Sequence, residues 1–372
     1  MEEYILEMRN ISKEFPGVKA LSNVNMQIKP KHIHALVGEN GAGKSTLMNI
    51  LSGVYPYGTY KGDIIIDGEI CRFKDIKESE AKGIAIIHQE LALIPTLSIA
   101  ENVFLGNEQA DKGIFIDWDR TRTKSMEMLK RVGLDENIDT RVMDLGMGKQ
   151  QLVEIVKALA KDVNILILDE PTAVLAEAEA KNLLDAIKKL AQKGIGIIFI
   201  SHRLDEIVDV ADKVTVLRDG EHVATKDLKD TNKFEIAEMM IGRKVSIDRT
   251  SSENKTTSDE SILSINNLHV SMPGERVKGI NLDVKKGEIV GIGGLAGQGK
   301  IGLANGLMGI YPATGDVVFN GNKLTLNDPM AAIHSGLAFV SEDRKGVGLL
   351  LDESIEGNIV FSSMQTRNDY LT

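Results

Sequence analysis

Short runs of aliphatic residues alternate along the chain with segments in which apolar residues recur every three or four positions. The runs IHALVG (from Ile33), NILILDE (from Asn164) and IGIIFIS (from Ile195) are almost entirely apolar, which is typical of strands buried on both faces. Between the last two lies AKNLLDAIKKLAQKG, whose apolar residues share one helical face: Leu183, Leu184, Ile187, Leu190 and Ala191. This alternation predicts an α/β fold with a mostly parallel sheet flanked by helices.

A glycine-rich turn follows the first run and leads into an apolar, helical segment. The turn is GENGAGKST (from Gly38), and the helix KSTLMNILSG ends at Gly53, the usual position of a C-terminal glycine. Glycines in such a turn let backbone N–H groups face phosphate oxygens, and the helix N-terminus adds a favourable dipole. Because strand, turn and helix occur together, we interpret the segment as a P-loop. Lys44 would neutralise β- and γ-phosphate charge, and the Ser45 hydroxyl would bind Mg²⁺.

Polar residues follow three other buried runs. ILILDE ends in Asp169, which is suited to hold Mg²⁺ through water, and Glu170, which is suited to polarise an attacking water. Taken alone, two acids after a buried strand usually mark only the strand end, but the upstream P-loop favours a catalytic interpretation. His202 in IIFISHRLDEI and Gln89 in AIIHQE follow runs of the same kind, and each taken alone is open to a purely structural role.

Composition narrows the class of protein. A chain of 372 residues is too long for one ordinary domain, and 42% hydrophobic with 4% aromatic residues describes a soluble, aliphatic-rich globular protein. The net charge of −10 argues against a dedicated nucleic-acid binder. The single cysteine, Cys71, fits a reducing compartment. The longest apolar runs are too short to span a bilayer, and the N-terminus lacks the pattern of a signal peptide.

The sequence contains an internal repeat. VNMQIKPKHIHALVGENGAGKSTL (from Val24) aligns with INLDVKKGEIVGIGGLAGQGKIGL (from Ile280), and KGIAIIHQE (from Lys82) aligns with SGLAFVSED (from Ser335). We therefore predict a first domain at residues 1–245, a polar linker at 246–260 and a second domain at 261–372. Because the second is much shorter, we expect it to be the N-terminal part of a copy of the first.

The second copy of the glycine-rich loop is imperfect. Its glycines and lysine are Gly294, Gly297, Gly299 and Lys300. In place of Ser45 and Thr46, however, Ile301 and Gly302 follow the lysine. The hydroxyl that would bind Mg²⁺ is missing, so we predict a degenerate second nucleotide site.

The order of these motifs resembles the nucleotide-binding subunit of ATP-binding cassette (ABC) transporters: P-loop, a strand followed by glutamine, ILILDEPT, then SHR. More narrowly, KEFPGVKAL, IHQEL and SEDRKGVGLLLDESIEGNI resemble the double-cassette ATPases of bacterial monosaccharide importers of the ribose, galactose and xylose type. GVYPYGTYKGDI is most similar to the xylose or multiple-sugar branch. The resemblance implies a P-loop NTPase cassette of α/β class with a mixed sheet, flanking helices and an N-terminal antiparallel β part. It also implies a helical subdomain at about 95–160 that faces the permease. A second, partial copy of the same fold would follow.

The resemblance also assigns roles by position. Phe15 would stack on adenine, Gln89 would touch Mg²⁺ and couple to the membrane subunit, and His202 would sense the γ-phosphate. Asp169 and Glu170 match the Walker B aspartate and the catalytic glutamate. The Walker A loop corresponds to Gly38, Glu39, Asn40, Gly41, Ala42, Gly43, Lys44, Ser45 and Thr46.

The chain departs from the family pattern in its signature segment. The L-S-G-G-Q sequence falls on Leu145 to Lys149, without its serine, although Gly148 and the following helix N-terminus keep backbone donors. The next motif, Ala173 to Ala176, lacks its aspartate, and Glu342 stands where the first copy has Gln89. Family cassettes pair head to tail, so this weakened signature would face the weakened loop at Gly294. We therefore expect one hydrolytic and one degenerate composite site.

The resemblance implies an ATP- and Mg²⁺-dependent ATPase that energises monosaccharide import from the cytoplasmic face of the membrane. Its partners would be integral-membrane permease subunits, indirectly a periplasmic or extracellular sugar-binding protein, and a second cassette or a second copy of the chain, with no nucleic acid. Two alternatives remain open. A soluble ABC-type ATPase of translation or repair is disfavoured by the acidic charge and the imperfect signature. A truncated, binding-only remnant is disfavoured by the intact first-copy residues Lys44, Ser45, Asp169, Glu170 and His202.

Overall fold

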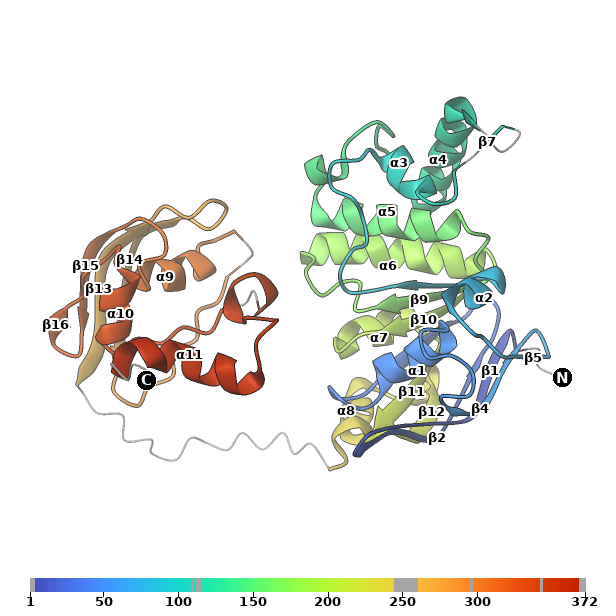
Figure 1. The fold of residues 1–372 in the computed structure, drawn as a ribbon, viewed down its shortest axis with the longest axis horizontal. Coiled ribbons are helices and arrows are strands. Elements are labelled where there is room, and N and C mark those ends of the chain that lie inside the picture. The colour runs from blue at the N-terminus through green and yellow to red at the C-terminus, as the bar shows by residue number, and fades with distance from the viewer. Residues whose placement is uncertain are drawn as a thin grey trace. The chain divides into compact units, whose positions relative to one another are not determined.

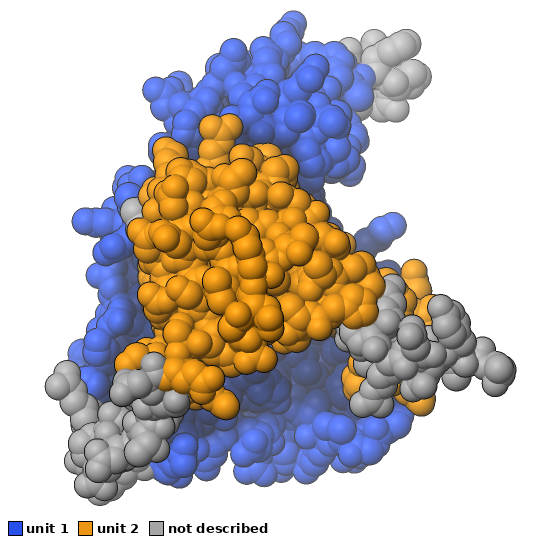
Figure 2. Space-filling model, turned by 90° about the vertical axis from the view of Figure 1, so that its left-hand side faces the viewer, with its two compact units in different colours: residues 1–247 blue, residues 248–372 orange. Residues whose placement is uncertain are grey.

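The structure is a computed structural model, and it describes residues 4–108, 110–111, 115–243, 260–294, 297–341 and 344–367. The chain forms two compact units, unit 1 at residues 1–247 and unit 2 at residues 248–372, which are coloured separately in Figure 2. Nearly all of the linker expected at 246–260 lies outside the described residues.

Unit 1 is built on a ten-stranded sheet with the order β5-β4-β1-β2-β12-β11-β3-β10-β9-β6 (Figure 1). The parallel part contains β11 (Lys213–Arg218), β3 (Ile33–Val37), β10 (Gly196–Ile200), β9 (Ile165–Asp169) and β6 (Ile84–Ile87). The antiparallel part contains β5 (Glu69–Cys71), β4 (Lys61–Ile66), β1 (Leu6–Phe15) and β2 (Val18–Ile28). Between them, β12 (Glu221–Asp227) pairs antiparallel with β11 and meets β2 at one residue pair.

The parallel strands are buried on both faces, which explains their continuous apolar sequences. In β9, Ile165 and Ile167 face one hydrophobic cluster, whereas Leu166 and Leu168 face the other. The first cluster also takes in apolar residues of α1 (Lys44–Leu51) and of the antiparallel strands. The second cluster contains residues of α3 (Ile99–Phe104), α5 (Met147–Leu159) and α6 (Glu177–Gln192), which lie together on one side of the sheet in Figure 1. The mixed sheet predicted from the sequence is therefore present.

The remaining elements of unit 1 are mostly helical. The longest are α4 (Trp118–Val132), α5 (Met147–Leu159) and α6 (Glu177–Gln192). The shorter ones are α2 (Ile76–Ala81), α3 (Ile99–Phe104), η1 (Val142–Asp144), α7 (Leu204–Val210), η2 (Leu228–Asp230) and α8 (Lys233–Ile241), with a small hairpin of β7 (Ala110–Asp111) and β8 (Phe115–Ile116). Helices α3, α4 and α5 contact one another, and they occupy the range expected for a helical subdomain.

Unit 2 repeats the antiparallel part of unit 1. Its sheet has the order β14-β13-β15-β16, which matches β2-β1-β4-β5. The strands are β13 (Ser261–Val270), β14 (Val277–Lys285), β15 (Ala313–Phe319) and β16 (Asn322–Lys323). The helices are α9 (Lys300–Leu307), α10 (Pro329–His334), the short η3 (Arg344–Gly348) and α11 (Ile355–Arg367).

Two segments of unit 2 differ from their counterparts in unit 1. The segments aligned with β3 and β6 are not strands, and Ile289 and Val340 within them are 87% and 94% exposed. In unit 1, β3 pairs with β10 and β11, and β6 pairs with β9. Within the described part of unit 2 no strand pairs with the two aligned segments. An apolar run forms a strand only where neighbours satisfy its backbone and cover its side chains.

Candidate functional site

Four loops of unit 1 meet at one edge of the parallel sheet. Ile200, the last residue of β10, pairs with Leu36 of β3 on one side and with Asp169 of β9 on the other. On the far side of β9, Leu168 pairs with Ile87, the last residue of β6. The carboxyl ends of these strands are therefore in register. At such an edge ligands bind to α/β sheets.

The backbone of the first glycine-rich loop is shaped by its glycines. Gly41 and Gly43 have φ angles of 86° and 97°, a region that side chains other than glycine's rarely adopt. At Gly38 the constraint is space, because a Cβ there would lie 2.4 Å from the Leu217 carbonyl oxygen. Helix α1 begins at Lys44 without a side-chain cap. Its first backbone N–H groups therefore remain available for an anion.

Lys44 lies over this loop. Its Nζ donates to the carbonyl oxygens of Gly38 at 2.8 Å and Glu39 at 3.1 Å. Burial lowers the pKa of Lys44, whereas the nearby charges of Glu170 and Asp169 act in the opposite direction. The ammonium is thus placed between the loop and the two acids at the end of β9.

A cavity of about 480 Å³ opens in front of the loop. Predicted site residues that line it are Asn40, Gly41, Gly43, Lys44, Ser45, Thr46, Gln89, Asp169 and Glu170. Five further lining residues were not predicted as site residues from the sequence: Val18, Lys19, Ala20, Asp219 and Gly220. Of these, only the dipeptide Asp219-Gly220 carries a signal, since it is typical of a tight turn between strands.

The two acids at the end of β9, Asp169 and Glu170, have different surroundings. Burial raises the pKa of Asp169, and the neighbouring Glu170 carboxylate raises it further. Glu170 has a φ of 49°, which is unusual for a residue with a side chain. Its Oε1 lies 3.1 Å from Nδ1 of His202, and its Oε2 accepts a 3.4 Å hydrogen bond from Nε2 of Gln89. The structure therefore brings together Glu170, His202 and Gln89, which the sequence places far apart.

Phe15 is not among the residues that line the cavity. It packs edge-on against Tyr55, with ring centroids 5.5 Å apart, and the ammonium of Lys13 lies 5.1 Å and 4.9 Å from the two rings. The β1-β2 hairpin that contains Phe15 contributes Val18, Lys19 and Ala20 to the described cavity lining. The adenine-stacking role of Phe15 stays a prediction.

The weakened signature lies at the start of α5, outside the cavity lining. Gly146 is the N-cap residue of that helix and provides no side-chain hydrogen bond. Gly148 is buried against α6, where a Cβ would lie 3.0 Å from Cβ of Glu179. A glycine here allows the two helices to approach closely.

The second loop keeps the backbone shape of the first. Gly297 and Gly299 have φ angles of 78° and 89°, and Nζ of Lys300 donates to the Gly294 carbonyl oxygen at 2.5 Å, as Lys44 does to Gly38. Its amides, however, are engaged by Glu275 of the same unit. Leu295, Ala296 and the predicted counterpart of Gln89, Glu342, lie outside the described residues.

A P-loop between a buried strand and a helix, with two acids at the end of another parallel strand of the same sheet, defines a P-loop nucleoside triphosphatase. The sequence matches the ABC transporter family over residues 21–173 and 277–369, and the chain belongs to that family. Two solved structures confirm the predicted cassette fold. A nucleotide-free ATP-binding cassette of an ABC transporter has a TM-score of 0.56 at 26% identity, over 64% of this chain and 95% of its own. The ADP conformation of another such cassette has a TM-score of 0.57 at 26% identity, over 64% and 99%.

Curated relatives are more similar in sequence. The L-arabinose transport ATP-binding protein of Geobacillus stearothermophilus is 52% identical over 98% of this chain and 72% of its own length. The xylose import ATP-binding protein of Thermoanaerobacter pseudethanolicus is 48% identical over 96% of this chain and 72% of its own length. In the part of the chain that the structure describes, no helix is long and apolar enough to cross a membrane.

Proposed function

We propose that unit 1 binds and hydrolyses ATP and that the chain energises the import of a five-carbon sugar. One observation carries the hydrolytic part: Lys44, Gln89, Asp169 and Glu170 line a single cavity in front of the P-loop, and His202 contacts Glu170 there. Charge placement of this kind is what phosphoryl transfer requires. The expected domains, 1–245 and 261–372, would then be a first cassette and part of a degenerate second one.

Each residue has a role that its position supports. The loop amides and Lys44 would bind the phosphates and balance their charge. Glu170 would accept a hydrogen bond from the attacking water and draw its proton away. His202, at 3.1 Å from Glu170, would orient that carboxylate and reach the γ-phosphate. The backbone strain at Glu170 fits a residue held in one position for chemistry.

The residues present also fit Mg²⁺, a cation that prefers oxygen ligands. The Ser45 hydroxyl, the Gln89 amide oxygen and the Asp169 carboxylate would hold it. The cation would offset phosphate charge and relieve the repulsion that raises the pKa of Asp169 beside Glu170. This donor set is confined to unit 1, because Ile301 and Gly302 follow Lys300 in the second loop.

The sugar is inferred from the relatives, which are named for arabinose and xylose, both five-carbon sugars. We propose that the chain works at the cytoplasmic face of the membrane with integral permease subunits and, indirectly, an extracellular or periplasmic sugar-binding protein. A second cassette or second copy would complete two composite sites, one hydrolytic and one degenerate. Residues that select the sugar would lie on the partner polypeptides.

The hydrolytic part is tested with the purified full chain. Glu170→Gln should keep ATP binding while lowering hydrolysis by about 100-fold or more, because the general base is lost. Glu69→Gln, at an exposed ion pair on β5, is the matched control and should hydrolyse like wild type. Equal hydrolysis by wild type and Glu170→Gln would contradict the proposal.

The transport part is tested separately in cells that lack this chain. Reintroducing the wild-type gene should restore uptake of labelled arabinose or xylose, whereas Lys44→Ala should not. If neither sugar depends on the gene while the purified chain still hydrolyses ATP, the sugar assignment fails and the ATPase assignment stands.

A further inference from the structure

The two glycine-rich loops have opposite charges beside them. In unit 1, Lys19 lines the cavity next to Gly41 and Gly43. The aligned residue in unit 2 is Glu275. The structures support this alignment, because Cβ atoms built at Gly43 and Gly299 would each lie 2.8 Å from the carbonyl oxygens of Ala20 and Arg276, the residues that follow Lys19 and Glu275.

The hairpin that carries Glu275 differs from its counterpart in unit 1. Strands β1 and β2 pair up to Phe15 and Val18, so only two residues connect them. Strands β13 and β14 pair up to Val270 and Val277, which leaves the longer connection Ser271 to Arg276. This connection turns through a hydrogen bond from the Glu275 amide to the Met272 carbonyl oxygen. Strand pairing thus ends earlier in unit 2, and Glu275 lies in the unpaired connection.

The Glu275 carboxylate is bound by the loop itself. Its two oxygens accept hydrogen bonds from the amides of Gly297 and Gly299, both at 2.6 Å, and the residue is only 9% exposed. These amides correspond to those of Gly41 and Gly43 in the first loop. Such an arrangement of N–H groups at a helix N-terminus binds anions, and here the anion is a side chain of the same unit.

Gly302 makes room for this contact. A Cβ at Gly302 would lie 1.9 Å from the carbonyl oxygen of Glu275, a distance that no structure tolerates. The aligned residue in the first loop is Thr46, which has a side chain. The glycine after Ile301 and the glutamate in the hairpin are therefore two parts of one feature. The glycine at position 302 therefore has a structural reason, because it leaves space for the backbone of Glu275.

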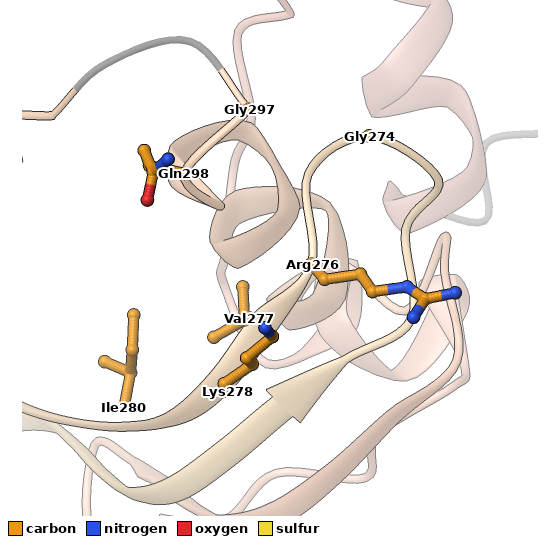
Figure 3. A pocket seen from close by; sticks show the side chains of 7 residues that line it. All are labelled: Gly274, Arg276, Val277, Lys278, Ile280, Gly297 and Gln298. Carbon is orange, nitrogen blue, oxygen red and sulfur yellow. The ribbon is translucent and has the colours of Figure 1, made fainter.

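The cavity beside the second loop takes in Gly297, but neither Glu275 nor Gly299 lines it. It measures about 520 Å³ and is lined by Gly274, Arg276, Val277, Lys278, Ile280, Gly297 and Gln298 (Figure 3). Figure 3 shows Val277, Lys278 and Ile280 along β14, with Gln298 on the loop. Lys300, whose counterpart Lys44 lines the first cavity, is not part of this lining among the described residues.

We propose that Glu275 closes the second loop to nucleotide phosphates by acting as a built-in substitute for them. A polyphosphate can bind only in molecules in which the hairpin has released the two amides. If the carboxylate is seated in at least nine molecules of ten, the apparent affinity falls about tenfold or more. The inference rests on unit 2 alone and does not depend on the sugar or on hydrolysis in unit 1.

Amide hydrogen exchange in the full chain tests whether the carboxylate is seated. Glu275→Ala should speed exchange at Gly297 and Gly299 by about tenfold or more, because both amides lose their acceptor. Gly302→Ala should do the same by displacing the hairpin, although alanine is the better helix residue. Asp316→Ala, which removes an exposed ion pair with Lys323, is the control and should leave both amides unchanged.

Binding of inorganic tripolyphosphate, measured by calorimetry, tests the consequence. The full chain carrying Lys44→Ala, which disables the first loop, should bind this probe at least tenfold more weakly than the same chain with Glu275→Ala. Adding Lys300→Ala should abolish the gain, because that lysine belongs to the second loop. Unchanged exchange in Glu275→Ala, or equal affinity with and without Glu275, overturns the proposal.

Discussion

The hydroxyl of Thr172 donates a 2.6 Å hydrogen bond to Oε2 of Glu206. Both residues are buried, with exposed fractions of 1% and 7%. The same carboxylate accepts a bond from the Ser201 hydroxyl at 3.4 Å, and its other oxygen lies 2.5 Å from the guanidinium of Arg203. One side chain of α7 thereby ties the loop that follows Glu170 to the segment that contains His202.

Glu206→Ala should therefore affect both stability and catalysis. The buried hydroxyl of Thr172 loses its acceptor and Arg203 loses its partner. We expect unit 1 to lose about 2 kcal/mol of unfolding free energy. ATP hydrolysis should fall about tenfold, since Glu170 and His202 lose a common support. Denaturant unfolding and steady-state kinetics measure the two effects.

Asp209→Asn on the same helix is the control. Asp209 is 65% exposed in its ion pair with Lys188, so this change should cost less than about 0.5 kcal/mol and leave hydrolysis unaltered. Similar losses in the two variants would mean that Glu206 has no special place between the two loops.

The parts of unit 1 that could be predicted from sequence are those in which neighbouring residues determine the structure. A buried strand, a glycine-rich turn and a helix are recorded in consecutive positions from Ile33 to Gly53. The meeting of Gln89, Glu170 and His202 was predictable because parallel strands end at a common sheet edge.

Other features depend on how distant hairpins pack, and no local pattern records that. Lys19 and Asp219 line the cavity because the β1-β2 and β11-β12 hairpins reach it. Glu275 reads as an exposed turn residue in the sequence, yet the structure buries it on two amides. Ile289 aligns with Ile33 of a buried strand, yet it is exposed, because strand formation there requires partners that the described residues of unit 2 do not supply.

His34 should make unit 1 sensitive to acid. It is 2% exposed and its Nε2 contacts the Thr215 hydroxyl at 2.7 Å. Burial lowers its pKa to about 3, and the positive charges of Lys213, His32 and His222 act in the same direction. Below about pH 6.5, His34 binds a proton in the unfolded chain but stays neutral in the folded chain. Stability is therefore retained above that pH and lost as pH falls towards 3.

The size of this effect is set by the difference between the two pKa values. Between pH 7 and pH 5 the wild type should lose about 2 kcal/mol more unfolding free energy than His34→Gln, at about 1.4 kcal/mol per pH unit. Denaturant titrations at several pH values measure the slope. His32→Gln, which removes a half-buried histidine near His34, should keep the wild-type slope. A slope that His34→Gln does not reduce would show that His34 is protonated in the folded chain.

Two glycines of the first loop should respond differently to alanine. Both have positive φ angles, so each change costs about 1 kcal/mol in backbone strain. At Gly41 a Cβ meets no atom within 4 Å, whereas at Gly43 it would lie 2.6 Å from Cδ2 of Leu21 and 2.8 Å from the Ala20 carbonyl oxygen. Gly43→Ala should therefore cost at least about 1 kcal/mol more than Gly41→Ala. Denaturant unfolding without nucleotide measures this, and equal costs would contradict the packing argument.

Asn102 and Asn358 make the same hydrogen bonds in the two units. Asn102 accepts from the Ile94 amide and donates to the carbonyl oxygens of Ile94, Leu97 and Ser98. Asn358 accepts from the Leu350 amide and donates to Leu350, Glu353 and Ser354. The repeat therefore extends through α3 and α11, with an asparagine fixing the loop before each helix.

The two asparagines differ in burial, and this difference gives a prediction. Asn102 is 0% exposed and its hydrogen bonds are partly buried, so Asn102→Ala removes bonds that water replaces poorly and should cost about 2 to 3 kcal/mol. Asn358 is half-buried and its partners Leu350, Glu353 and Ser354 are exposed, so water can replace the amide and Asn358→Ala should cost about 1 kcal/mol or less. Hydrogen exchange read separately over α3 and α11 measures each loss. Equal increases in exchange for the two substitutions would contradict the idea that burial makes the hydrogen bonds of Asn102 more stabilising than those of Asn358.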